Sequence, residues 1–160
     1  MDPESGKKAE NGRPRTDRRG PLGVLRRWFR GPSNASSAKP ASRTVSGARG
    51  RPTALSGLSA MQFIGRNDRV VLDLWAGWCR PCRAFSPVVE EVARRFVDRV
   101  AFGKVNVERD PSLAEGWKVV SIPTLLFFRD GRLVGRLTGV RPPQTLEREI
   151  RRILKLGRDD

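Results

Sequence analysis

The chain has 160 residues, enough for one domain or at most two, and a formal net charge of +15. It contains two cysteines and no histidine, which excludes a Cys–His protease and a Cys/His zinc site within one chain. No apolar run approaches the roughly 18 residues of a transmembrane helix, and residues 1–20 lack the apolar core of a secretory signal. We therefore expect a cytoplasmic protein.

The first third of the chain is basic and poor in apolar residues. Residues 1–53 carry 13 Lys or Arg against 4 Asp or Glu, a net of +9, and hold 19 Gly, Pro or Ser. Such a segment buries too little surface to offset its ordering entropy, so we predict a disordered basic extension. Residues 22–30 interrupt it with leucines, a Trp-Phe pair and arginines. This island is a candidate anchor for an anionic surface, or a chance cluster in a solvated tail; no specific nucleic-acid binding is expected.

The globular pattern begins with a short helix and a strand. Ser56–Ile64 is predicted to be helical, with Leu58, Met61 and Phe63 facing inward. No clear edge strand is visible around Thr53–Leu55. Val70–Trp75 is a continuous apolar run, typical of a strand that is buried on both faces.

A second helix is predicted after the two cysteines. Its apolar stripe has helical spacing and consists of Phe85, Val88, Val89, Val92 and Phe96. Pro87 lies inside this helix and removes one backbone hydrogen bond, so we expect a kink there. Val100–Val107 is predicted to be a strand, and Asp110–Trp117 a loop with a short helix.

The last elements are a hairpin and a helix. Thr124–Phe128 and Leu133–Leu137 flank Asp130-Gly131, a strong two-residue turn signal. The C-terminal amphipathic helix carries Leu146, Ile150, Ile153, Leu154 and Leu156. This order of helices and strands predicts an α/β domain, with a central mixed β-sheet flanked by helices on both faces.

Both cysteines lie in the segment W-A-G-W-C-R-P-C-R, residues 75–83. Their spacing is compatible with a zinc half-site, a structural disulfide or a redox-active dithiol. Zinc needs four ligands, so only a dimer that shares two cysteines from each chain could complete a site. A structural disulfide with two intervening residues constrains the unfolded chain very little, and a reducing compartment would open it.

Two readings of the pair then remain: inert buried thiols and a redox dithiol. The pair follows a buried strand and opens a helix, where unpaired N–H groups and the helix dipole favour a thiolate, the reactive form of cysteine. Pro81 suits the first helical turn, because its missing N–H has no intrahelical partner there. The position favours the redox dithiol.

This segment resembles the active-site segment of the thioredoxin family, and the resemblance covers residues 54–160. Further landmarks of that family appear in order and are Asp73 in the strand, Pro87 in the helix, Lys104, Ile122-Pro123 and Gly139. The resemblance implies the thioredoxin fold for residues 54–160. The basic extension is no part of it.

The resemblance also implies roles for four site residues. Cys79 would be the nucleophile and the more exposed sulfur, and Cys82 the resolving cysteine, so that Cys79–Cys82 forms the redox-active disulfide. Asp73 would accept the Cys82 proton, because burial in an apolar strand raises the pKa of a carboxyl group. Lys104 would tune Asp73, although it could equally be a solvated strand lysine.

Five further residues complete the expected site. The resemblance implies a cis bond before Pro123, which would turn the Ile122 backbone outward to pair with an extended substrate. An ordinary trans proline starting a strand is the alternative. Thr138 and Gly139 are expected to bind substrate, and Trp78 to form an apolar rim of the site.

The residue between the cysteines departs from the family pattern. Thioredoxins usually carry Gly-Pro there, whereas this chain has Arg80-Pro81. A guanidinium near the sulfurs should favour the Cys79 thiolate and the reduced form, and so make the couple somewhat more oxidising.

The implied function is that of a monomeric protein-disulfide reductase without a cofactor. Its partners would be disulfide-containing client proteins and an electron donor such as thioredoxin reductase. One alternative is an extracytoplasmic disulfide oxidant or cytochrome-maturation protein. A protein of that class is expected to have a signal or anchor helix, and relatives of that kind often have an insertion between the cysteines and the cis-proline. Another is a binding protein targeted by its tail, with an incidental redox pair.

Overall fold

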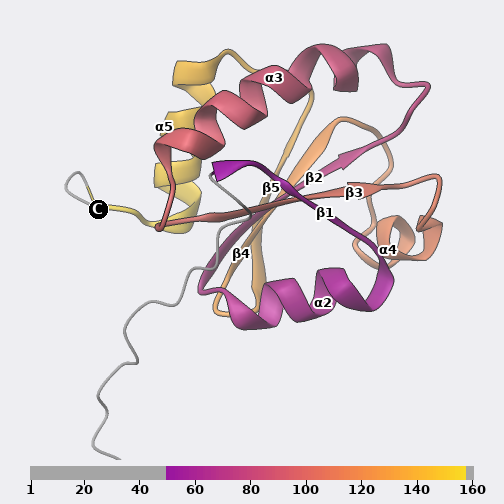
Figure 1. Cartoon of the computed structure of the whole chain (residues 1–160), viewed down its shortest axis with the longest axis horizontal. Coiled ribbons are helices and arrows are strands. Elements are labelled where there is room, and N and C mark those ends of the chain that lie inside the picture. Colours follow the sequence, from indigo (N-terminus) through magenta and orange to yellow (C-terminus); the bar gives the residue numbers. More distant parts are fainter. Residues whose placement is uncertain (1–49, 158–160) are drawn as a thin grey trace, which may run out of the picture. The chain divides into compact units, whose positions relative to one another are not determined.

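The computed structural model describes residues 50–157 (Figure 1). Apart from residues 50–53, the basic extension predicted over residues 1–53 lies outside this range, as does its candidate anchor at residues 22–30. Gly50 is already buried, and Thr53 opens the first strand, so ordered structure begins before residue 54.

A five-stranded mixed sheet forms the centre of the described residues. The strands are β1 (Thr53–Leu55), β2 (Arg69–Trp75), β3 (Ala101–Asn106), β4 (Thr124–Arg129) and β5 (Arg132–Thr138). Their order in the sheet is β1-β3-β2-β4-β5. β3 runs parallel to β1 and β2, whereas β4 is antiparallel to β2 and β5. The predicted mixed sheet is confirmed, and β2 lies at its centre.

The edge strand that the sequence analysis left out is present. Thr53–Leu55 pairs in parallel with Gly103–Val105 of β3. Three residues are too few to show the alternation of buried and exposed side chains that marks a strand in a sequence. This strand is defined instead by its backbone pairing with β3. Gly103 leaves room for the Leu55 and Leu72 side chains, because a Cβ there would lie 2.4 Å from Leu55 Cδ1 and 2.8 Å from Leu72 Cδ2. The expectation of no strand at this edge was wrong.

Helices cover both faces of the sheet, as predicted. They are α2 (Gly57–Arg66), α3 (Arg80–Arg95), α4 (Pro111–Gly116) and α5 (Pro143–Leu154). Figure 1 shows α3 and α5 on one side of the sheet, and α2 and α4 on the other. Each side has its own apolar core, because Phe85 of α3 and Leu146 of α5 share one cluster, while Ile64 of α2 belongs to another. α3 continues through Pro87 to Arg95.

The inward face of α2 agrees with the prediction at Phe63 and differs from it at Leu58 and Met61. Leu58 and Met61 are 73% and 51% exposed, whereas Ala60 and Ile64 are buried and Phe63 is partly buried. Positions 60, 63 and 64 have the spacing of one helical face, and this face packs on the sheet. Alanine at the centre of that face is too small to mark it in the sequence.

The β4–β5 hairpin turns where Asp130-Gly131 predicted it. Both turn residues have positive φ angles, 51° for Asp130 and 77° for Gly131, as a two-residue primed turn requires. The opposite end of the hairpin pairs Thr124 with Thr138 and carries the candidate site. None of the helices in residues 50–157 has the length and apolarity needed to cross a bilayer.

Candidate active site

Strand alternation places Asp73 beneath α3. Successive side chains of a strand point to opposite faces. Leu72 and Leu74 belong to the core on the α2 side, and Val71 belongs to the core on the α3 side. Asp73 and Trp75 therefore point toward α3, at the end of β2 where the chain leads into the two cysteines.

The two cysteines form a disulfide across the first turn of α3. Cys79 is the N-cap residue, and its sulfur accepts a hydrogen bond from the Cys82 backbone N–H at 3.2 Å. The Cα atoms lie 5.3 Å apart, within the usual range for a disulfide. Pro81 occupies the first turn, where its missing N–H has no intrahelical partner. Arg80 begins the helix between the two cysteines and is exposed.

Residue exposure does not distinguish the two cysteines. Each is 3% exposed, so the expectation that Cys79 is the more exposed is not met at the residue level. In the disulfide form both pack in one small cluster with Ala76, against Trp75 and Ile122. Their surroundings differ instead, because Cys82 alone lines a cavity that also contains the Asp73 carboxyl group.

This cavity has a volume of about 260 Å³. It is lined by Asp73, Trp75, Cys82, Arg83, Ser86 and Lys104. Within residues 50–157, the buried Oδ1 atom of Asp73 has no hydrogen-bond partner. Burial raises the pKa of Asp73 from 3.8 to about 7, and the nearby charge of Lys104 partly opposes this shift. A carboxyl group that titrates near neutral pH thus shares a cavity with one of the two sulfurs.

Lys104 lies beside Asp73 because of the strand register. The two residues are direct partners between the parallel strands β2 and β3. The Lys104 Nζ atom lies 5.8 Å from the centroid of the Trp75 ring, a cation–π distance. Among the described ion pairs none joins Lys104 to Asp73, so its influence on the carboxyl group acts through space.

A second loop approaches the disulfide from the start of β4. The Ile122–Pro123 peptide bond is cis. Pro123 is buried, and its carbonyl accepts a hydrogen bond from the Gly139 N–H at 2.8 Å. Gly139 has a φ of 86°, which favours glycine, and the exposed Thr138 lies with its Oγ1 atom 3.1 Å from that of Thr124. The structure thus joins the proline loop to the end of β5.

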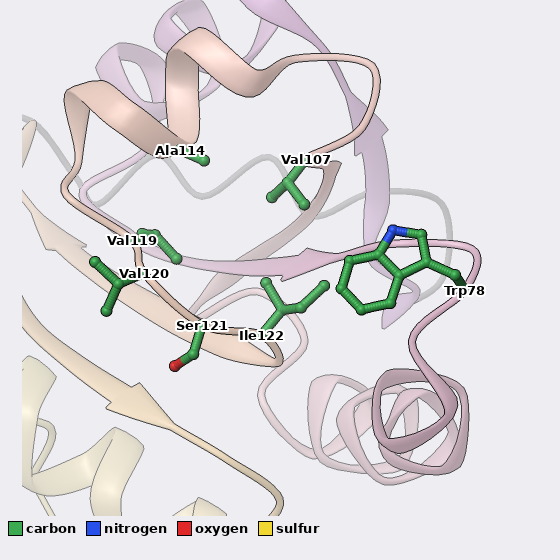
Figure 2. A pocket seen from close by; sticks show the side chains of 7 residues that line it. All are labelled: Trp78, Val107, Ala114, Val119, Val120, Ser121 and Ile122. Atoms are coloured by element: carbon green, nitrogen blue, oxygen red, sulfur yellow. The ribbon is translucent and has the colours of Figure 1, made fainter.

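An apolar groove of about 410 Å³ begins at this loop (Figure 2). Figure 2 shows the Trp78 indole beside the Ile122 side chain, although the two residues lie far apart in the sequence. Trp78 is 68% exposed, as a rim residue should be. Both were predicted site residues. Thr138 and Gly139 do not line this groove, although Gly139 is bonded to Pro123.

Sequence reasoning missed the rest of the groove. The additional lining residues are Val107, Ala114, Val119, Val120 and Ser121. Val120 is 97% exposed, which is unusual for an apolar side chain. Its position two residues before Ile122 was the available signal, since the segment entering the proline loop had to face the cysteines.

Comparison with known protein sequences gives one consistent result. The family profile described as Thioredoxin matches residues 59–152. The thioredoxin of Alicyclobacillus acidocaldarius subsp. acidocaldarius is 38% identical over 101 residues, which are 63% of this chain and 96% of that protein. Thioredoxin 1 of Synechococcus elongatus is 46% identical over 77 residues, 48% of this chain and 72% of that protein.

Solved structures agree with the sequence comparisons. A mutant thioredoxin from Halobacterium salinarum NRC-1 superposes with a TM-score of 0.63 at 29% identity, covering 70% of this chain and 98% of that one. The oxidised mitochondrial thioredoxin 3 of Saccharomyces cerevisiae gives 0.58 at 32% identity, covering 63% of this chain and 94% of that one. This chain belongs to the thioredoxin family and is a thiol–disulfide oxidoreductase.

Proposed function

We propose that the chain reduces the disulfides of client proteins, with Cys79 as the attacking and Cys82 as the resolving cysteine. One observation carries the proposal: the Cys79–Cys82 disulfide packs against Val107 and Ile122, which line the apolar groove, while Cys82 also lines the cavity that Asp73 lines. The groove supplies a place for a polypeptide, and the cavity supplies a proton acceptor.

The reaction transfers two electrons in two exchange steps. The Cys79 thiolate of the reduced enzyme attacks one sulfur of the client disulfide, forms a mixed disulfide, and releases the other client sulfur as a thiolate. The Cys82 thiolate then attacks the Cys79 sulfur, which forms the Cys79–Cys82 disulfide and releases the second client thiolate. The client gains two electrons and, after protonation, two thiols, while the enzyme dithiol becomes a disulfide.

Asp73 is proposed to accept the proton that Cys82 must lose before the second step. The carboxyl group and Cys82 line the same cavity, and no other acidic side chain lines it. A base is most effective when its pKa is near the working pH, and the pKa of about 7 for Asp73 meets this condition. Lys104, beside it in the sheet, keeps this pKa from rising further.

The Ile122 backbone is proposed to hold the client chain. Within residues 50–157, neither its amide nor its carbonyl makes a backbone hydrogen bond. Free backbone groups beside a groove can pair with an extended peptide as an added strand. The apolar groove from Trp78 to Val120 would receive side chains of the same peptide.

Renewal of the dithiol requires an electron donor. Thioredoxins act on disulfide substrates and are reduced by thioredoxin reductase, and we propose the same donor class for this chain, in the cytoplasm. The proposal is supported by the family match over residues 59–152.

The test of this function is reduction of insulin disulfides. The full chain, supplied with dithiothreitol, should accelerate the precipitation of insulin well above the rate with dithiothreitol alone. With NADPH and a thioredoxin reductase in place of dithiothreitol, insulin should drive NADPH consumption. No acceleration in either assay would contradict the proposed function. If the chain accelerates the reaction with dithiothreitol but not with NADPH and the reductase, only the proposed donor is rejected.

Replacement of Arg80 by glycine should make the couple more reducing. Arg80 is exposed at the start of α3 and follows Cys79 directly. Its charge favours the Cys79 thiolate and therefore the reduced form, so its removal should lower the reduction potential. Solvent screening limits the effect to about 5–15 mV. Equilibration of both proteins with a glutathione redox buffer measures the difference, and an unchanged or higher potential for Arg80→Gly would contradict this electrostatic role.

A further inference from the structure

Acidic side chains on the helical face far from the groove are already paired with arginines. Glu91 and Glu147 both bind Arg95, and Glu149 binds Arg152. All of these residues belong to α3 beyond its first turns or to α5. Arg95 and Arg152 therefore already have carboxylate partners within the protein.

Three arginines on the first turn of α3 and on the segment after β5 lack such partners. Among residues 50–157, no carboxylate forms an ion pair with Arg80, Arg83 or Arg141. Arg80 and Arg83 are exposed, and Arg83 also lines the cavity at Cys82. The end of the molecule that meets a client thus carries uncompensated positive charge.

Arg141 brings a guanidinium group to the proline loop. Its Nη1 atom lies 3.4 Å from the position that a Cβ on Gly139 would occupy, and it donates a hydrogen bond to the Val140 carbonyl at 2.8 Å. Gly139 in turn donates to the Pro123 carbonyl. The remaining N–H groups of Arg141 have no partner within the described residues, and a guanidinium fork suits a carboxylate.

One carboxylate lies next to the groove in the sequence and binds the segment before Trp78. Glu108, which follows the lining residue Val107, accepts a hydrogen bond from the Gly77 N–H at 2.9 Å. Gly77 directly precedes Trp78. The charge around the site is therefore asymmetric, positive at Arg80 and Arg141 and negative beside Trp78.

We propose that this site selects client disulfides that are flanked by acidic residues, whose carboxylates meet Arg80 and Arg141 while apolar side chains enter the groove. This inference rests on the proposed function and names its substrate class. It favours a polypeptide over a nucleic acid, because the groove that Trp78 and Ile122 line is formed mainly by aliphatic side chains. Single-stranded nucleic acid needs successive aromatic stacking surfaces, and Trp78 is the one aromatic residue in the lining.

The experiment compares three peptides, each closed by a disulfide between two cysteines and differing only in Glu, Gln or Lys beside each cysteine. The full chain is used in reduced form, and the second-order rate constant for the reduction of each peptide is measured with the wild type, Arg141→Gln and Arg132→Gln. Arg132→Gln is the matched control, because it removes the same charge at the hairpin end of β5, far from Thr138. The basic extension is present in all three proteins, so its attraction for acidic peptides cancels.

The readout is the ratio of the second-order rate constant for the Glu peptide to that for the Gln peptide. This ratio should be about threefold lower in Arg141→Gln than in the wild type at low salt, and the difference should shrink at about 0.5 M salt. Arg132→Gln should keep the wild-type ratio. Glu108→Gln, which retains an oxygen for the Gly77 amide, should raise the ratio.

Equal ratios in the wild type, Arg141→Gln and Arg132→Gln, with the Gln peptide still reduced, would overturn the inference and leave the proposed function standing. Failure to reduce any peptide would overturn both. A single-stranded oligonucleotide that blocks reduction of the Gln peptide by the wild type, but not by Arg141→Gln, would assign this face to nucleic acid and overturn the inference.

Discussion

Replacement of Cys79 by serine is expected to abolish insulin reduction by this chain, with a rate loss of at least about 10³-fold. The first exchange step needs a sulfur nucleophile that can form a disulfide with the client, and a serine hydroxyl can neither ionise near neutral pH nor form that bond. Dithiothreitol-driven insulin precipitation measures the loss.

Serine is a well-matched replacement because Cys79 is the N-cap of α3. Its sulfur accepts the Cys82 N–H, and a serine hydroxyl is a preferred acceptor at an N-cap. The variant should therefore keep the fold, which circular dichroism checks. Substantial activity in a folded Cys79→Ser protein would show that Cys82 or another group performs the attack.

Replacement of Asp73 by asparagine is expected to stabilise the oxidised protein at alkaline pH by about 2–4 kcal/mol. Asp73 is buried with an unpaired Oδ1 atom, and its pKa of about 7 in the folded protein is far above the value of 3.8 for an unperturbed carboxyl group. Between these two pH values the folded state holds a proton that the unfolded state has released. The contribution of Asp73 to the free energy of unfolding therefore falls as pH rises from about 4 to about 7, and then stays low.

Denaturant unfolding of the wild type and Asp73→Asn at about pH 4 and about pH 8 measures this effect. The difference between the two proteins is the relevant quantity, because other acidic groups contribute equally to both. A difference that is the same at both pH values would show that the carboxyl group is not held neutral by burial. Lys104→Met should widen the wild-type pH dependence, since the lysine charge lowers the Asp73 pKa.

The centre of the fold could be predicted because its signals are local. Val70–Trp75 is apolar throughout apart from Asp73. The apolar run predicts a buried strand, and the single carboxyl group within it stands out as a candidate functional residue. Asp130-Gly131 marks the hairpin through the backbone conformation that it permits. The same run of residues that predicted the strand thus predicted the candidate proton acceptor.

The features that were missed depend on contacts between distant segments. β1 is defined by its pairing with β3, and three residues carry no pattern of their own. The buried face of α2 centres on Ala60, and large apolar residues on the same helix face solvent. Val119 and Val120 become groove residues because the proline loop brings them toward Trp78, and their place just before Ile122 is the one signal of this that their segment carries.

Trapping of the covalent intermediate tests the central claim, that Cys79 attacks a client disulfide and Cys82 resolves the product. Reduced Cys82→Ser protein is mixed with a disulfide-bridged peptide and measured by mass spectrometry without reducing agent. The proposed mechanism predicts an adduct of chain plus peptide that dithiothreitol releases and that fragmentation places on Cys79, because the second exchange step cannot occur. The mechanism is contradicted if Cys82→Ser forms no adduct while Cys79→Ser forms one through Cys82.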